Sequence, residues 1–485
     1  MSAFRWFILV LCTLLYIALH WRRNKSKLPL PPGPKKLPLI GNLLDIPRDH
    51  QWEAYHRWSK ELNSDIIHVD AAGTSIIVLS SMEAIRDLFE QRSSLYSDRL
   101  RLPMICELMG WDFAFPFMNY GDEWRLGRKL FHAAFNRSAA TQFHPQETAA
   151  VHELLRRSLQ NPHEIMRHFR HMAGALIMDI TYGIKVLPSK DPYIQLVEKV
   201  MQDFSNASIP GAFLVDIFPA LKYVPSWFPG AGFKRKAKEW RKALREVLKK
   251  PFHEAKRNIA MGTAQPSFTS LKLYDVDESE ISDRTTQESL IKGVAAIMRK
   301  SIPLLAQEIS PDFAAEPLLP YVSAIVKEVL RWKNITPIGF PHYISVDDEY
   351  RGYRIPAGSL VIGNAWAVLH DEEAYADPHS FDPERFLLDG TLNSTVRDPD
   401  IAAFGFGRRI CPGRYMATAS IWITVASMLA AFDIKKAVDE NGQVVEPLFE
   451  YSSTGVISAP LPFRCSITPR SPQVVEAIQA TGGSQ

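Results

Sequence analysis

Cysteine is scarce in this chain of 485 residues, and its four cysteines are far apart, at Cys12, Cys106, Cys411 and Cys465. Their spacing matches neither a zinc site nor the framework of a small disulfide-bonded secreted fold. A cysteine with a chemical role would therefore act alone. A charge excess is also lacking, because 56 basic residues stand against 53 acidic ones, for a net charge of +3. This balance does not indicate nucleic acid as a partner.

Internal repeats and low-complexity tracts are absent from the body of the chain, whose 46% hydrophobic content is enough for a large core. Alternating apolar residues at 66–69 and 75–79 predict two early strands. Ser80 followed by Glu83 predicts the capped start of a helix over 82–91. Helical periodicity then dominates to about residue 333, short strands such as those in 352–366 follow, and a long helix is expected at 414–432. The predicted fold class is mainly α with a small β region.

The first segment, residues 4–21, is almost uninterrupted apolar sequence and just long enough to span a bilayer, which takes about 17–25 residues. Four basic residues follow it, and no small-residue cleavage site does, which favours an uncleaved anchor over a signal peptide. The dense prolines that come next are typical of a stiff spacer. We expect a membrane anchor at 1–22, a basic, proline-rich neck at 23–40, a catalytic domain at 41–470 and a tail at 471–485.

A strongly basic helix is expected at 233–258, with eleven Lys or Arg between Lys234 and Arg257 against three Glu. One reading is a solvated helix face. The other is a docking face for an acidic electron-donor protein or an anionic membrane surface.

The strongest local motif is FGFGRRICPG at residues 404–413, directly before the expected helix at 414–432. Its glycines allow the backbone to approach a flat ligand. At a helix entrance, amide N–H groups and the helix dipole favour a thiolate at Cys411. A lone thiolate beside Arg409 suits an axial ligand of heme iron, with the guanidinium pairing a propionate. A structural cysteine, a reactive nucleophile and a glycine turn without a ligand remain as alternatives.

Two further constellations bear on this motif. Glu328 and Arg331 lie three apart on the expected helix at 318–333, so that they can pair, and Arg385 in FDPERF is available as a third member. An isolated Glu-x-x-Arg is usually a surface pair. Trp124 and Arg128 are four apart on one helical face, which brings an indole and a guanidinium together for a second carboxylate.

With these motifs in this order, the chain resembles the cytochrome P-450 superfamily from its N-terminal segment to about residue 470. The cysteine loop matches the family at Phe404, Gly407, Arg409, Cys411 and Gly413. The resemblance implies the cytochrome P-450 fold and heme b, with Cys411 as the axial iron ligand. It also implies that Arg409, Trp124 and Arg128 bind the propionates and that Glu328, Arg331 and Arg385 form a structural triad.

The phrases LPPGPKKLPLIGN and WFPGAGFKRKAKEWR look like those of membrane-bound enzymes of mushroom-type fungi, many of them in secondary metabolism. The resemblance therefore implies a single-pass protein of the endoplasmic-reticulum membrane with a cytosolic catalytic body. It implies electrons from NADPH through cytochrome P-450 reductase, with cytochrome b5 as a further donor. The reaction would insert one oxygen atom of O2 into a hydrophobic small molecule. By analogy with the family, the pocket is expected at 102–117, 336–340 and 453–456.

The chain departs from the family at the helix that crosses the heme. Residues 287–298 are an ordinary approach to this helix, but Arg299 onward resembles the end of the next helix, and Pro303 would interrupt helical structure. The family's glycine–acid–threonine stretch is absent, and Thr285 and Thr286 precede the helix, so no catalytic residue is identified. We expect the central helix to be truncated near 298–303. The sequence then omits an exon, or the chain is a catalytically impaired heme-binding paralogue, or it is an O2-independent heme-thiolate isomerase or dehydratase.

Overall fold

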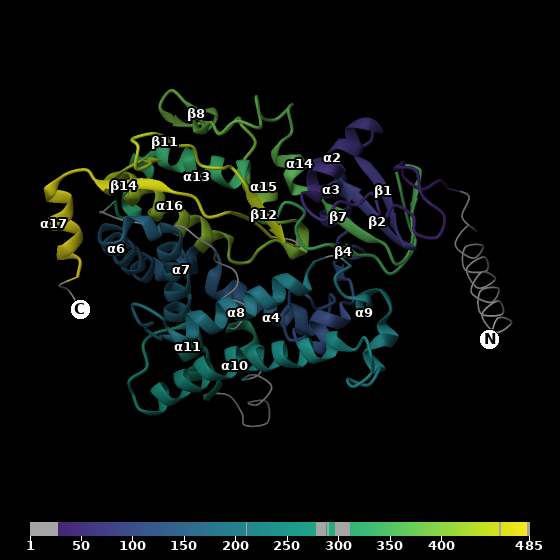
Figure 1. The fold of residues 1–485 in the computed structure, drawn as a ribbon, viewed down its shortest axis with the longest axis horizontal. Helices are drawn as coiled ribbons and strands as arrows, with labels where there is room; N and C mark the ends of the chain where they lie inside the picture. Colours follow the sequence, from purple (N-terminus) through teal and green to yellow (C-terminus); the bar gives the residue numbers. More distant parts are fainter. Residues whose placement is uncertain are drawn as a thin grey trace.

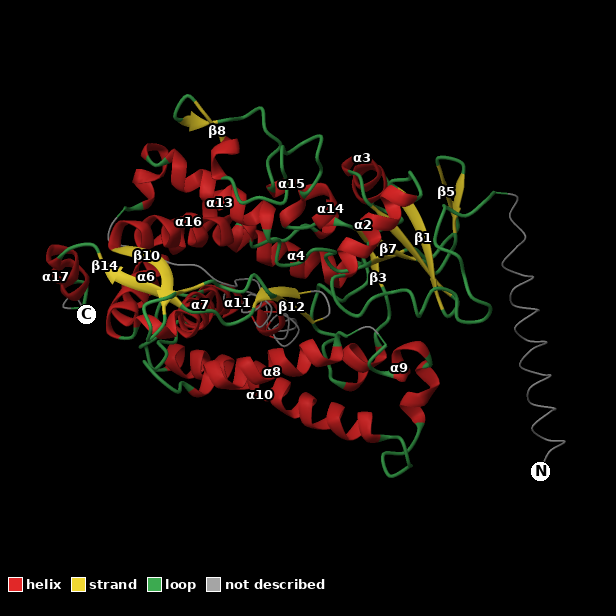
Figure 2. Cartoon of the chain, turned by 45° about the horizontal axis from the view of Figure 1, so that its top comes forward, coloured by secondary structure: helices red, strands yellow, loops and turns green. Residues whose placement is uncertain are grey.

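The computed structural model describes residues 28–209, 211–277, 288, 291–295, 311–454 and 457–482. Helices make up most of this part of the chain, which confirms the predicted class (Figure 2). The largest sheet lies at one end of the molecule, and the long helices fill the rest (Figure 1). The helices are α2 (Gln51–Glu61), α3 (Met82–Ile85), α4 (Asp122–Phe135), α5 (Arg137–Ala140), α6 (His144–Gln160), α7 (Ile165–Tyr182), α8 (Pro192–Ala207), α9 (Leu214–Ile217), α10 (Gly232–Ala260), α11 (Phe268–Asp277), α13 (Pro320–Trp332), α14 (Ala365–Leu369), α15 (Asp400–Ala403), α16 (Arg414–Ala431) and α17 (Pro472–Ala480).

The largest sheet has the strand order β1-β2-β7-β4-β3. The two predicted early strands are present as an antiparallel pair in which Ile66 lies opposite Leu79. The second of them also pairs in parallel with a strand that follows the helical region, so the sheet joins the two ends of the body. Its strands are β1 (Ile66–Ala71), β2 (Thr74–Leu79), β7 (Leu360–Gly363), β4 (His342–Tyr343) and β3 (Asp98–Arg99).

Smaller sheets complete the strand-rich part of the chain. One has three strands in the order β11-β10-β14, and three are hairpins. Their strands are β11 (Val444–Val445), β10 (Phe432–Val438), β14 (Cys465–Pro469), β12 (Tyr451–Thr454), β13 (Ile457–Pro460), β5 (Asp348–Tyr350), β6 (Tyr353–Ile355), β8 (Leu387–Leu388) and β9 (Thr391–Leu392).

The predicted helix start after β2 is off by one residue. Ser81, rather than Ser80, is the N-cap, and its hydroxyl accepts a hydrogen bond from the Ala84 amide at 3.1 Å. The same hydroxyl donates to a carboxylate oxygen of Asp65 at 2.5 Å. This second bond explains why the helix begins after Ser81 and not after Ser80. The side chain of Ser80 has no hydrogen-bond partner among the described residues.

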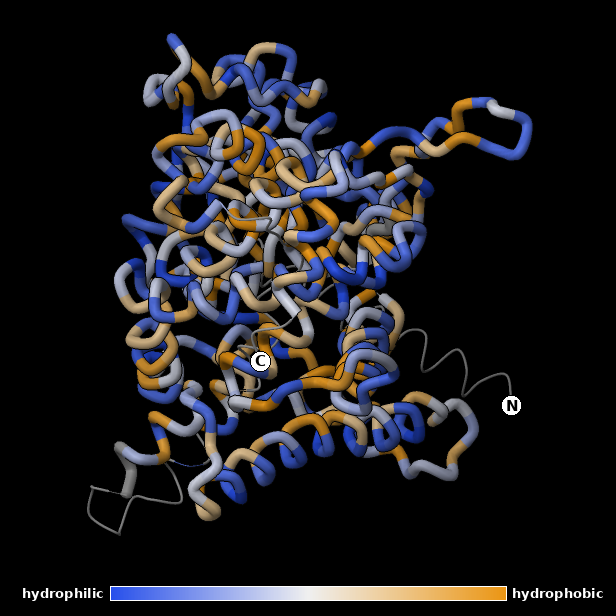
Figure 3. Tube along the Cα trace, turned by 90° about the vertical axis from the view of Figure 1, so that its left-hand side faces the viewer, coloured by the Kyte–Doolittle hydropathy of each residue, from blue (hydrophilic) through white to orange (hydrophobic). Residues whose placement is uncertain are grey.

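Helix α10 is amphipathic, as its periodicity predicts. Ala237, Leu244 and Val247 are buried against the neighbouring elements, which are α7, α8, α11 and the turn η2 (Pro103–Leu108). Most of its basic side chains are exposed, whereas Lys234 and Arg241 are half-buried and donate to backbone carbonyls of neighbouring segments. Figure 3 shows this division along the lower edge of the molecule, where α10 lies in Figure 1, with hydrophilic residues outside and hydrophobic ones inside.

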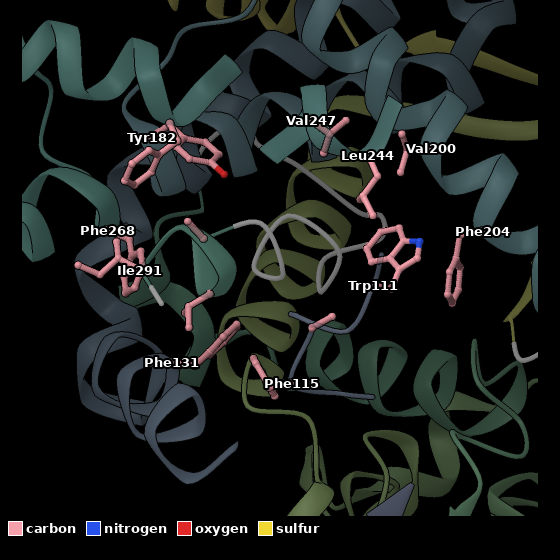
Figure 4. Close-up of a cluster of buried hydrophobic side chains, with 14 of the residues drawn as sticks. Trp111, Phe115, Phe131, Tyr182, Val200, Phe204, Leu244, Val247, Phe268 and Ile291 are labelled. Atoms are coloured by element: carbon pink, nitrogen blue, oxygen red, sulfur yellow. The ribbon is translucent and has the colours of Figure 1, made fainter. Parts of the chain in front are cut away.

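The largest hydrophobic core lies between α4, α7, α8, α10 and the loop that precedes α4 (Figure 4). A second core joins α6, α7, α13 and α16. The start of the expected central helix belongs to the first core, because Ile291, Val294 and Ala295 are buried there in helical conformation. The predicted truncation near 298–303 lies outside the described residues.

The predicted location has to be corrected. In the described part of the chain, none of the helices is both long enough and apolar enough to cross a membrane. This finding contradicts the expected single-pass endoplasmic-reticulum protein, and we withdraw that expectation. The expected anchor at residues 1–22, on which it rested, lies outside the described residues.

The described part of the expected neck, residues 28–40, lies against the body. The Pro32 carbonyl accepts a hydrogen bond from the amide of His68 in β1, and the Pro29 carbonyl accepts one from the amide of Arg354 in β6, each at 2.8 Å. Gly33 passes so close to β1 that an added Cβ would lie 1.9 Å from the His68 carbonyl oxygen. In both hydrogen bonds the proline supplies the carbonyl acceptor, so its lack of a backbone N–H does not weaken the contact.

A buried carboxyl in α6 predicts a pH-dependent stability. Glu147 is 1% exposed, and burial raises its pKa to about 8, which the hydroxyl of Ser420 in α16 opposes by donating to it at 2.5 Å. The folded protein therefore retains this proton while the unfolded chain, with a pKa near 4.5, loses it. The contribution is complete below pH 4.5 and falls by about 1.4 kcal/mol per pH unit until about pH 8. Chemical denaturation across this range should show that Glu147→Gln removes this component. An unchanged pH profile in the variant would contradict the assignment.

Candidate functional site

The loop before α16 places Cys411 at the centre of the site. The turn η9 (Gly407–Arg409) leads into it, and the Cys411 amide donates to the Phe404 carbonyl oxygen at 2.8 Å, which closes the loop. Gly413 is the N-cap of α16, and its amide donates to the Cys411 thiol. The residue that the sequence singled out is therefore fixed at two points, its backbone amide by the Phe404 carbonyl and its thiol by the Gly413 amide.

Gly407 is required where this loop crosses the turn η1 (Arg86–Gln91). Its φ is +55°, and an added Cβ would lie 2.0 Å from the Phe89 carbonyl oxygen. Gly405 also has a positive φ, +80°, but an added Cβ there would meet nothing within 4 Å. The two glycines thus serve different purposes, close packing at Gly407 and backbone conformation at Gly405.

The thiol of Cys411 combines deep burial with accessible surface. Burial raises the pKa of this thiol, whereas the Gly413 amide and the guanidinium groups of Arg128 and Arg414 lower it. The sequence expectation of a lowered pKa at the helix entrance is therefore wrong for the protein alone, because desolvation exceeds the local effects. Yet the side chain is only partly covered. A cation coordinated at this partly covered sulfur would favour the thiolate.

Arg409 joins the cysteine loop to the segment before α4. Its Nε donates to the Ser97 carbonyl at 2.8 Å, and its two Nη atoms donate to the carbonyls of Phe115 and Met118 at 3.1 and 2.8 Å. Its guanidinium carbon lies 4.5 Å from the centre of the Trp124 ring. Burial lowers the pKa of this guanidinium to about 10, with Asp98 opposing the shift.

Trp124 and Arg128 of α4 both face this loop, as their spacing predicts. Arg128 donates to the carbonyl of Ile410, the residue before Cys411, and burial lowers its pKa. The indole of Trp124 is 5% exposed, and its Nε1 finds no hydrogen-bond partner in the described part of the chain. A buried N–H without a partner is unfavourable unless a ligand accepts it.

Sequence reasoning missed two further residues here, Arg99 and His342. Arg99 in β3 donates to the carbonyls of Pro116, Phe340 and Pro341 at 3.1, 2.6 and 2.9 Å. Burial lowers its pKa to about 9, and the neighbouring Arg409 lowers it further. His342 in β4 is also buried, and its pKa lies well below the ordinary value, again through burial. Only their position in one sheet beside the cysteine loop brings them into the site, and no local motif marks it.

Glu328 and Arg331 form a fully buried ion pair in α13, each 0% exposed. Two nitrogens of Arg331 donate to the two carboxylate oxygens of Glu328 at 2.6 and 2.7 Å. Its remaining N–H groups donate to the carbonyls of Leu369, Pro378 and Ser380. A buried pair is stable only when its hydrogen-bonding groups are satisfied, and this arrangement meets that condition.

Arg385 approaches the same pair more loosely. Its Nε lies 3.4 Å from a carboxylate oxygen of Glu328 but has no hydrogen-bond partner among the residues that the structure describes. Its Nη atoms donate to the carbonyls of Ala376, Asp377 and Ser380 instead. The three residues of the expected triad are together in space, and their role in supporting the cysteine loop stays a prediction.

The expected pocket segments meet only in part. Residues 102–117 and 336–340 come together, because the ring centres of Phe117 and Phe340 are 5.7 Å apart. In the central helix, Gly293 packs against Phe113, 3.6 Å from ring carbon Cδ2 to the Cβ position of the glycine. The side chains of 453–456 lie outside the described residues.

The comparisons with known proteins agree with this fold and site. A family model described as cytochrome P-450 matches residues 31–302 and 294–463. The chain therefore belongs to the cytochrome P-450 family, as its motifs predicted. The two matched segments divide at the position where the sequence departs from the expected central helix.

Several curated fungal proteins are similar over almost their whole length. The chain is 46% identical to cytochrome P-450 monooxygenase 98 of Postia placenta, over 96% of this chain and 94% of that protein. It is 42% identical to the monooxygenase ple1 of Rhodocybe pseudopiperita, over 94% and 93%. It is 38% identical to the tryptamine 4-monooxygenase of Psilocybe cyanescens, over 97% and 98%. Proteins of this kind are oxidoreductases that carry heme.

The residues present fit a heme with its two propionate carboxylates. Arg99 is buried, Arg128 and Arg409 are half-buried, and all three donate mainly to backbone carbonyls, while the Trp124 N–H has no partner in the described chain. Shielded cations that are held mainly by carbonyl dipoles are costly, and two carboxylates from a ligand would offset that cost. The partly covered thiol of Cys411 is the matching donor for iron.

Gly407→Ala should abolish the site, whereas Gly405→Ala should be tolerated. The left-handed conformation costs alanine about 1–2 kcal/mol at either position. Only at residue 407 does the new Cβ also collide with a backbone oxygen, which no side-chain rotation can relieve. We expect a large fall in the thermal unfolding midpoint and loss of heme for the first variant, and a fall of a few degrees with heme retained for the second. Equal behaviour of the two variants would show that packing against Phe89 is unimportant.

Proposed function

We propose that this protein is a heme-thiolate monooxygenase that inserts one oxygen atom of O2 into a hydrophobic small molecule of fungal secondary metabolism. Three observations support the proposal together. The lone thiol of Cys411 is only partly covered, three guanidinium groups held mainly by backbone carbonyls lie in the same region, and the relatives that cover nearly the whole chain carry monooxygenase names. The fungal origin of these relatives supports the metabolic context.

Within this proposal, Cys411 is the axial iron ligand, and heme bound in this way supplies the oxidising chemistry with O2. Arg409, Trp124 and Arg128 bind the propionates, and the missed residue Arg99 contributes a further buried positive charge beside them. Phe404 accepts the hydrogen bond that closes the loop, Gly407 allows the loop to pack on η1, and Gly413 donates to the sulfur. Glu328, Arg331 and Arg385 hold α13 to the segment around residues 376–382 that they contact.

We further propose that electrons come from NADPH through cytochrome P-450 reductase, docked near the cysteine loop. Three exposed basic residues in and beside the loop support this site, because they suit an acidic partner. Arg408 lies in the loop, Arg125 lies over the same Tyr120 ring as Arg408, and Arg137 lies over Tyr415 at the start of α16. The basic face of α10 is a weaker candidate for this docking. It lies on the opposite side of the molecule from α13 and α16 in Figures 1 and 2. A solvated face is the better reading of α10.

A second candidate is an O2-independent heme-thiolate isomerase or dehydratase. Two observations favour it: the sequence lacks the acid–threonine pair, and the family model matches in two segments that divide at residues 294–302. A catalytically impaired heme protein shares these observations. Turnover of a lipid hydroperoxide without NADPH or reductase would support the second candidate. Turnover that requires NADPH, reductase and O2 would support the first, and absence of both with heme bound would indicate impairment.

Cys411→Ala should remove the heme-thiolate signature. The reduced, carbon-monoxide difference spectrum of the purified 485-residue protein should show a strongly red-shifted Soret band, and this band should be absent from the variant. Cys106→Ala and Cys465→Ala are matched controls, since both remove a free cysteine elsewhere in the described chain. A normal band in Cys411→Ala would exclude Cys411 as the ligand, and a missing band in the folded wild-type protein would argue against the whole proposal.

A further inference from the structure

Five aromatic rings form a continuous run in the region where the expected pocket segments meet. The ring of Phe117 lies between those of Phe204 and Phe340, with ring centres 5.8 and 5.7 Å apart. Phe204 also contacts Trp111 at 5.4 Å, and Trp111 stacks on Phe113 at 5.8 Å with 20° between the ring planes. Figure 4 shows Trp111 facing Phe204 at one end of the hydrophobic cluster. The rings come from the loop before α4, from α8 and from the loop before β4.

This run is tied at one end to the arginines beside Cys411. The carbonyls on either side of Phe117 accept hydrogen bonds, that of Pro116 from Arg99 and that of Met118 from Arg409. The carbonyl of Phe340 also accepts one from Arg99, at 2.6 Å. Phe117 and Phe340 are therefore held beside the groups that fit the heme propionates, in a fixed relation to the cysteine loop.

The other end of the run meets the start of the central helix. Phe113 packs against Gly293, since its ring carbon Cδ2 lies 3.6 Å from the Cβ position of the glycine. Trp111 and Phe204 are buried, 4% and 2% exposed, and fix the middle of the run in the core. Phe113, Phe117 and Phe340 are only partly buried, so their rings retain surface that a ligand can contact.

The chemistry of these rings selects for a particular kind of ligand. All five side chains are uncharged, so recognition along the run depends on burial and on ring contacts. Aromatic rings prefer offset or edge-to-face partners because each ring has a negative face and a positive edge. An aromatic ligand reproduces these contacts when it inserts beside Phe117 or Phe340. A saturated ring of the same size buries similar area but has no such electrostatic complement.

We propose that the substrate of this protein is a flat, uncharged aromatic compound, bound against Phe117 and Phe340. The inference rests on the proposed function, since it assigns the substrate class of the same site. Each ring contact favours an aromatic over a saturated ligand by roughly two- to tenfold. Hydrophobic burial alone predicts the opposite order, because the saturated compound is the more hydrophobic of such a pair.

Equilibrium dialysis of the heme-loaded protein against 2-naphthalenemethanol and decahydro-2-naphthalenemethanol tests the inference, since both compounds carry a primary aliphatic hydroxyl and differ in the saturation of the rings. We expect 2-naphthalenemethanol to bind about tenfold more tightly. Phe117→Leu and Phe340→Leu should lose this preference while they still bind the saturated compound. Phe135→Leu is the matched control, because Phe135 belongs to a separate ring cluster with Phe131 and Phe143 and should keep the preference.

Equal or tighter binding of the saturated compound by the wild-type protein would overturn the inference, as would a preference that both leucine variants retain. Dialysis needs no heme signal, so the preference is measured whether or not the carbon-monoxide spectrum has the thiolate band. Failure of the proposed function is therefore read from the spectrum and failure of the substrate class from the dialysis.

Discussion

Guanidinium groups that are held inside the protein mainly by backbone carbonyls are the constraint on which this structure depends. Arg99, Arg128 and Arg409 each donate to backbone carbonyls around the cysteine loop and bring the segments before α4, before β4 and before α16 together. A carbonyl compensates a buried cation only partly, because it supplies a dipole and no charge. The protein alone therefore holds three positive charges close together beside the cysteine loop, which suits the anionic ligand proposed above.

The buried ion pair of α13 resolves the same difficulty in a different way. Arg331 has its counter-charge in Glu328, and its other N–H groups are satisfied by carbonyls, so it needs no ligand. This contrast distinguishes an arginine that stabilises the fold from arginines that line the candidate site. A buried arginine that is fully paired holds elements together, and one that is paired only with carbonyls marks a place for an anion.

Local patterns in the sequence predicted much of the fold and part of the site. Strong periodicity predicted β1, β2, α10 and α16. Fixed spacing predicted that Trp124 lies beside Arg128 and that Glu328 pairs with Arg331.

The sequence did not reveal Arg99 and His342 as site residues, because strand pairing joins segments that are distant in sequence and leaves no short motif. The thiol pKa was misjudged for a related reason, since local dipoles are visible in the sequence and the extent of burial is not. The N-cap of α3 is Ser81 because Asp65, on another segment, accepts a hydrogen bond from that hydroxyl.

The docked proline segment has a practical consequence for handling this protein. Residues 29 and 32 supply carbonyl partners to two different sheets, one through His68 and one through Arg354. A chain cut just before residue 28 keeps both, whereas one cut at residue 41 leaves two strand amides without their acceptors and opens the close contact at Gly33. A tag or fusion joined ahead of the prolines would also start from a fixed place on the surface of the body, because the proline segment is hydrogen-bonded to the body at two points.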